Sequence, residues 1–115
     1  MLDKISKLTL KDSSLLCDAC FIGGEWVAAD GGGTIKVDNP ATGAIVGSVP
    51  NMGAVETKRA IEAANAALPA WRARTAKERS AILRKWFDLM MANQEDLAMI
   101  MTAEQGKPLA ESRGE

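Results

Sequence analysis

The last fifteen residues constrain the fold most, because a helix end stands directly before a helix start. Gly106 can adopt the left-handed conformation that closes a helix, and Pro108 suits the first turn of the following helix. That following helix, residues 109–115, has only begun where the sequence stops. We therefore expect the chain to be a piece of a longer protein, with part of its function carried by residues outside it.

The whole sequence divides into three segments. Residues 1–20 form a mixed polar arm without a clean period, residues 21–50 are rich in strand and turn signals, and residues 51–115 carry helical patterns. A chain of 115 residues is one domain at most. The predicted fold class is α/β, with a short β-hairpin and strands followed by three to four α-helices.

The strand signals lie in the second segment. A tight hairpin is predicted around residues 23–25 (GGE), because glycine supplies the positive φ that such turns need. Residues 34–37 alternate as a half-buried strand does. Residues 39–43 (NPATG) are dense in turn formers, and the strand over 44–49 is expected to end at Pro50.

Three helices are predicted in the third segment. The first carries an apolar stripe, and Pro69 is expected to end or kink it. The second begins at a capping box, in which the Glu78 amide donates to the Thr75 hydroxyl while the Glu78 carboxylate reaches back. The third runs from about Asn93 to Gly106. The stripe residues are Ile61, Ala64, Leu68 and Trp71 in the first helix and Ile82, Leu83, Trp86, Phe87 and Met90 in the second.

These apolar faces are wide for so small a chain. The second helix is expected to bury its stripe, and the few short strands have exposed edges that need a partner sheet. We expect both the strand segment and the helical segment to pack on protein that this chain does not contain.

Composition limits the partners. The chain is 47% hydrophobic and 25% charged with a net charge of −1, so it has no general attraction for nucleic acid or anionic lipid. No apolar run reaches the roughly 20 residues needed to span a bilayer, and the N-terminus lacks the apolar stretch of a signal peptide. We expect a cytoplasmic protein with reduced cysteines and no nucleic-acid or membrane partner.

Most chemical motifs in the sequence argue against a catalytic, metal or phosphate-binding site. The sequence has no histidine, which removes the commonest general base and metal ligand. Cys17 and Cys20 have CxxC spacing, yet no other Cys or His can complete a zinc site and the segment runs into a hairpin, which favours two incidental cysteines over a redox pair. A phosphate loop ending at Gly106 would need a glycine in place of Met101 and a hydroxyl in place of Pro108.

Two clusters allow two interpretations each. The basic residues between Arg72 and Lys85 can form a nucleic-acid patch with aromatic platforms, or a solvated helical face whose tryptophans point inward. Because Trp86 continues the apolar stripe, the second interpretation is favoured. Four methionines can form a soft-metal site or fill a core, and their places on apolar helical faces favour core filling. They are Met90, Met91, Met99 and Met101.

Several blocks of the sequence resemble the aldehyde dehydrogenase superfamily. They are residues 21–26 (FIGGEW), 39–43 (NPATG), 70–72 (AWR), 75–79 (TAKER) and 104–109 (EQGKPL). Their order and the gaps between them agree with that superfamily, and the likeness extends from about residue 15 to the end. Further runs, at 49–54, 67–72 and 86–91, are similar to bacterial succinate-semialdehyde dehydrogenases. Glutarate-semialdehyde enzymes share these N-terminal blocks.

The resemblance implies the N-terminal quarter of a chain roughly four times longer, with nucleotide-binding, catalytic and oligomerisation domains. In that family an aldehyde is oxidised to an acid with NAD or NADP. A cysteine thiolate attacks the carbonyl, hydride passes to the nicotinamide, and a glutamate activates the water that cleaves the thioester. These groups lie downstream in the family. We therefore assign no catalytic or cofactor-binding residue here, and Cys17, Cys20 and Glu104 do not match those groups.

The resemblance also implies one site inside this chain. Several family members bind K⁺ or Na⁺ at positions that correspond to the backbone carbonyls of Val37 and Asp38 and the carboxylate of Glu104. Oxygen ligands of this kind suit a hard monovalent cation. The alternative is that Glu104 is a buried carboxylate that holds a helix end.

Two classes of function follow. The first is the N-terminal part of an NAD(P)-dependent semialdehyde dehydrogenase that oxidises succinate semialdehyde to succinate, with glutarate semialdehyde or another aldehyde as the alternative substrate. The full-length protein is implied to be a homo-oligomer, a dimer or tetramer, and the 115-residue chain alone is expected to be inactive. The second class is a non-catalytic helical adaptor that binds a partner through its apolar faces, or an inert truncated product.

Overall fold

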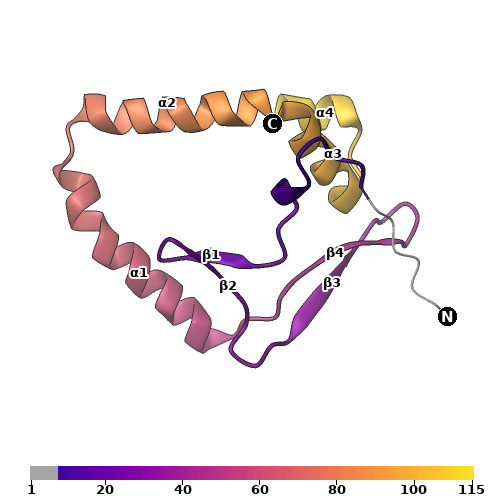
Figure 1. The fold of residues 1–115 in the computed structure, drawn as a ribbon, viewed down its shortest axis with the longest axis horizontal. Coiled ribbons are helices and arrows are strands. Elements are labelled where there is room, and N and C mark those ends of the chain that lie inside the picture. The colour runs from indigo at the N-terminus through magenta and orange to yellow at the C-terminus, as the bar shows by residue number, and fades with distance from the viewer. Residues whose placement is uncertain (1–7) are drawn as a thin grey trace.

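The computed structural model describes residues 8–115, so the first seven residues of the predicted arm lie outside it. Strands precede helices, as predicted; they form two small hairpins followed by four helices, and Figure 1 shows them arranged as an open frame. In chain order the elements are η1 (Ser13–Leu15), β1 (Cys20–Ile22), β2 (Glu25–Val27), β3 (Thr34–Asp38), β4 (Ile45–Pro50), α1 (Ala54–Ala73), α2 (Ala76–Ala92), α3 (Gln94–Gln105) and α4 (Leu109–Gly114).

The first hairpin pairs β1 with β2 through a two-residue turn. Gly23 and Gly24 have φ of 61° and 85°, the left-handed conformations that a tight turn of this kind requires. The predicted turn is confirmed, although Glu25 belongs to β2. Phe21 and Trp26 stand opposite each other with ring centroids 5.2 Å apart, a cross-strand aromatic pair that adds to the stability of so short a sheet.

The second hairpin pairs β3 with β4 in antiparallel register from Thr34 opposite Pro50 to Asp38 opposite Ile45. Strand β4 ends at Pro50, as predicted, and includes that residue, because proline is tolerated at the end of an edge strand. The predicted half-buried alternation of residues 34–37 is wrong. Only Val37 is half-buried, because no layer packs on most of this strand.

Helix α1 passes through Pro69 and ends only at Ala73, so the prediction that Pro69 ends this helix is wrong. A proline removes one backbone hydrogen bond, and the surrounding helix formers keep the last turn in place. The capping box that begins α2 is confirmed: Glu78 N donates to Thr75 Oγ1 at 3.2 Å, and Thr75 N donates to Glu78 Oε2 at 2.8 Å. Among residues 8–115 no helix combines the length and apolarity needed to cross a bilayer.

The chain is more extended than a closed domain of its size. Its radius of gyration is 17.0 Å, against about 13 Å for a compact domain of equal length. It exposes 8795 Å², against about 6,100 Å² for a folded monomer of this mass. Within the described residues no large side chain is fully buried, and the buried apolar residues are small: Ala29, Ala44, Val46, Ala98 and Ala103. The core therefore lies where α3 meets the second hairpin.

The predicted buried face of α2 is exposed, which corrects the interpretation that its tryptophan points inward. All five residues of that face are exposed, with Trp86 at 61%. Met90 and Met91, predicted to fill a core, are exposed as well. The physical reason is visible in Figure 1, where α2 meets its neighbours only at its two ends. This outcome agrees with the expectation that the apolar faces pack on protein outside this chain.

We predict that the purified chain binds a hydrophobic dye such as ANS, with a blue-shifted emission, because fifteen large apolar residues of the described part are exposed. The control is Trp86→Glu combined with Phe87→Lys, which removes the two largest rings from α2 and should reduce the dye signal. A monomeric chain that leaves the dye spectrum unchanged would contradict the open structure.

Candidate functional site

The turn between β3 and β4 is held by its own hydrogen bonds. Asn39 N donates to Ala44 O at 2.8 Å and Gly43 N donates to Asn39 O at 2.7 Å. The Asn39 side chain accepts from Ala41 N at 2.9 Å, as an asparagine in a turn commonly does. Gly43 has a φ of 71°. These bonds fix Pro40 at the tip of the hairpin.

The end of α3 lies against this turn. Gly106 closes the helix with a φ of 88°, and its N–H donates to Thr102 O at 2.9 Å, which confirms the predicted left-handed cap. A Cβ on Gly106 would lie 2.9 Å from Pro40 Cγ. Two segments far apart in the sequence, residues 39–43 and 104–109, therefore meet at this point.

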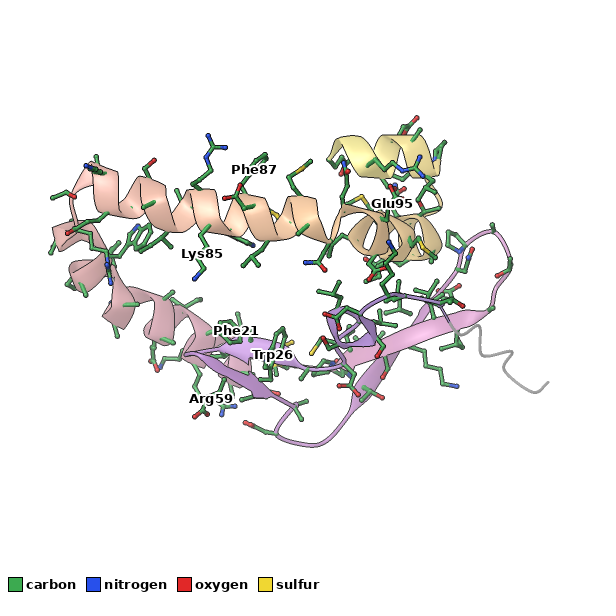
Figure 2. The ribbon with its side chains drawn as sticks, turned by 45° about the horizontal axis from the view of Figure 1, so that its top comes forward. Phe21, Trp26, Arg59, Lys85, Phe87 and Glu95 are labelled. Carbon is green, nitrogen blue, oxygen red and sulfur yellow. The ribbon has the colours of Figure 1, made fainter. Side chains whose placement is uncertain are left out.

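Helix α4 is fixed to α3 by side chains of both helices. The hydroxyls of Thr102 and Ser112 are 2.8 Å apart. Arg113 donates to both carboxylate oxygens of Glu95, at 2.7 and 3.1 Å, and Gln94 Nε2 donates to Arg113 O at 2.9 Å. The hydrogen bond from Arg113 lowers the pKa of Glu95, and the same bond raises the pKa of Arg113. Figure 2 shows Glu95 between the two helices.

The N-terminal arm is held by Asp96, in the first turn of α3. Its two carboxylate oxygens accept from Lys11 N at 3.0 Å and Asp12 N at 2.9 Å. The bond from Asp12, then that from Lys11, lowers the pKa of Asp96, because both stabilise the charged carboxylate. The sequence analysis missed this contact. Its one signal was an acidic residue in a first helical turn, and nothing in the arm indicated the partner.

A pocket of about 590 Å³ lies between the strands β3 and β4, residues 16–18 of the arm and the end of α3. Val37 and Glu104 both line it, so the structure brings together two of the three residues predicted to hold a cation. Asp38 follows Val37 at a register shift, where Val46 of β4 has no partner in the ladder. Such a bulge bends β4, the strand that carries the extra residue. Val37 and Glu104 thus line one pocket, together with Lys36 and Asp18, while Asp38 is not among the lining residues. A backbone carbonyl and a carboxylate are donor types that suit a hard cation.

The alternative prediction for Glu104, a buried carboxylate holding a helix end, is wrong. Glu104 is exposed, and its carboxylate accepts no hydrogen bond from any residue between 8 and 115. The helix end is closed by the Gly106 amide instead, so the Glu104 carboxylate remains free to face the pocket.

The two cysteines lie near this pocket as free thiols. Cys17 is exposed and lines the pocket, and Cys20 is half-buried as the first residue of β1. No three side chains among the acidic residues and cysteines of the described chain gather as a metal-binding group.

Residues 26–115 match the sequence profile of the Aldehyde dehydrogenase family. The chain belongs to the aldehyde dehydrogenase family. The four helices and the second hairpin fall wholly within this match, so the junction of the turn with α3 is part of the aldehyde dehydrogenase architecture.

Individual aldehyde dehydrogenases agree with this assignment. The chain is 65% identical over 108 residues to glutarate-semialdehyde dehydrogenase of Pseudomonas putida, and 61% identical over 108 residues to the NADP-dependent succinate-semialdehyde dehydrogenase of Escherichia coli. Each match covers 94% of this chain and 22% of the relative. The solved structure of succinate-semialdehyde dehydrogenase from Burkholderia pseudomallei superposes with a TM-score of 0.89 at 62% identity, over 92% of this chain and 22% of that one.

The chain thus spans about a fifth of the length of these relatives. The predicted aldehyde dehydrogenase-like fold is confirmed, and so is the predicted similarity to bacterial semialdehyde dehydrogenases. Glutarate- and succinate-semialdehyde enzymes match nearly equally.

Proposed function

We propose that this chain is the N-terminal part of an NAD(P)-dependent semialdehyde dehydrogenase that oxidises succinate semialdehyde to succinate. The observation that supports this most is the similarity to such enzymes along 94% of the chain. The reaction consumes aldehyde, water and oxidised nicotinamide, and yields carboxylate and reduced nicotinamide. Glutarate semialdehyde is the second candidate substrate, which the 65% identity to the Pseudomonas putida enzyme favours.

Within that enzyme the chain acts as scaffold. No residue of it is assigned to the chemistry or to the cofactor. The turn at residues 39–43 and the end of α3 hold each other through Pro40 and Gly106, and α3 in turn holds α4 and the arm. A monovalent cation held by the carbonyls of Val37 and Asp38 and the carboxylate of Glu104 would tie the same two segments together. Crystals grown with rubidium should then show anomalous density among these three oxygens, and density for water alone would remove the cation.

The proposed function is tested with the chain alone and in a chimera. The purified chain is expected to produce no NADH or NADPH from succinate semialdehyde. Substituting the chain for the matching segment of the Escherichia coli enzyme should give a folded enzyme with kcat/KM within about tenfold of the parent, a loss below about 1.4 kcal/mol. Turnover by the isolated chain, or a soluble chimera without activity, would overturn the proposal.

A further inference from the structure

A pocket of about 580 Å³ lies where α1 meets α2. Trp71, Leu83 and Phe87 give it apolar walls, and Arg79 and Arg84 line it as well. Figure 2 shows Phe87 on the side of α2 opposite Lys85 and pointing away from the strands. We call these five lining residues the α1–α2 pocket.

The surroundings of this pocket are strongly basic. Residues 72–85 contain six lysines and arginines and one acid. Arg79 and Arg84 line the pocket, whereas Lys85 lies on the opposite side of α2. The single acid, Glu78, is engaged in the capping box of α2. An acidic group that approaches this corner is therefore attracted, and a basic one is repelled.

Arg79 carries a donor that the described chain leaves unsatisfied. Its Nε is buried and has no hydrogen-bond partner among residues 8–115. A buried donor without an acceptor is costly, and guanidinium groups bind carboxylates through paired N–H donors. The neighbouring Arg84 guanidinium stacks over the Phe87 ring at 5.3 Å from its centroid, which places a second cation beside the apolar wall.

A second copy of this chain does not suit the pocket. A symmetric contact through this face would set Arg79 and Arg84 of one copy against the same two arginines of the other. The chain nevertheless has a large area available to a partner. It exposes 8795 Å², about 2,700 Å² more than a closed monomer of this mass. An excess accessible area of that size on one partner matches the area that obligate interfaces bury. The occupant is thus an acidic protein segment that differs from this chain.

We propose that the α1–α2 pocket docks an acidic segment of the aldehyde dehydrogenase polypeptide outside the fifth represented here. A carboxylate of that segment accepts from the Arg79 guanidinium, and an adjacent apolar side chain packs between Trp71, Leu83 and Phe87. The proposal rests on the proposed function, because that function supplies the remaining polypeptide.

The test uses the 115-residue chain and overlapping synthetic peptides that cover the rest of the Escherichia coli enzyme, with binding measured by fluorescence anisotropy. The peptides that bind should carry Asp or Glu beside an apolar residue. Arg79→Met should weaken their binding by about tenfold or more, the effect of losing a charge-assisted bond. A peptide whose acid is replaced by the corresponding amide should bind the wild-type chain as weakly as the acidic peptide binds Arg79→Met. That amide peptide should bind Arg79→Met no more weakly than it binds the wild-type chain.

The matched control is Arg74→Met, which removes one positive charge from the same corner at a residue that does not line the pocket. It should weaken binding much less than Arg79→Met. Three results would overturn the proposal: no peptide binds, the bound peptides lack an acid, or the two arginine variants lose binding equally.

The chimera separates this inference from the proposed function. Its crystal structure should show a carboxylate oxygen from beyond the grafted chain within hydrogen-bonding distance of the Arg79 guanidinium. An active chimera without such a carboxylate overturns the docking inference and leaves the proposed function standing. An inactive chimera, with acid-dependent peptide binding intact, overturns the proposed function and leaves the pocket's chemistry in place.

Discussion

Gly106→Ala is expected to lower the free energy of unfolding by about 2 kcal/mol or more. Gly106 has a φ of 88°, which costs any residue with a Cβ about 1–2 kcal/mol. The new Cβ would also lie 2.9 Å from Pro40 Cγ, closer than van der Waals contact allows. Because Pro40 is held in its turn by the Asn39 hydrogen bonds, it cannot move away freely. Urea unfolding followed by circular dichroism measures the change.

Two other glycines divide this effect into its parts. Gly43 has a φ of 71° and no atom within 4 Å of an added Cβ, so Gly43→Ala measures the backbone strain alone, about 1 kcal/mol. Gly31 has neither a positive φ nor a close neighbour, so Gly31→Ala should be nearly neutral. Pro40→Ala should recover part of the stability lost in Gly106→Ala. If Gly106→Ala were no more harmful than Gly43→Ala, the contact between turn and helix end would not exist.

Most of the fold could be predicted from signals between residues close in the sequence. The glycine pair of the first hairpin, the capping box at Thr75 and the left-handed cap at Gly106 each depend on residues close in sequence, and each is found as predicted. Pro69 shows where local reasoning fails. A proline inside a helix costs stability, but the balance depends on the rest of the helix, which here continues to Ala73.

Burial could not be predicted in the same way. The periodicity of α2 correctly indicates an apolar face, but a stripe says only that a face is suited to packing, not that this chain contains its partner. Trp86 and Met90 are accordingly exposed. The same limit applies to the candidate site. Residues 37 and 104 could be paired only through the family resemblance, because no local pattern joins the end of a strand to the end of a helix so far along the chain.

The contact between Asp96 and the arm could not be predicted from the sequence. It joins a helical carboxylate to two backbone amides of a segment that has no periodic pattern. Asp96→Asn is expected to increase amide hydrogen exchange at Lys11 and Asp12 by about tenfold, since an amide offers one neutral acceptor where the carboxylate offers two charged ones. Exchange followed by NMR or mass spectrometry measures this. The matched control is Glu95→Gln, which removes the partner of Arg113 and keeps both arm bonds. It should loosen α4 and leave the arm amides protected.

The same carboxylate predicts how the arm responds to pH. Its pKa is lowered in the folded chain below the usual 3.8, first by the bond from Asp12 and then by that from Lys11. A carboxyl group with a lowered folded pKa contributes stability that is complete above the unfolded value and is lost as pH falls through the folded one. The positive charge of Lys11 also lowers the pKa of Asp96, and Lys11 and Glu95 line the same pocket as Asp96. Protection of the arm amides should therefore be constant near neutral pH and fall below pH 3.8, with a much smaller change in Asp96→Asn. Equal acid sensitivity in the two proteins would show that another group releases the arm.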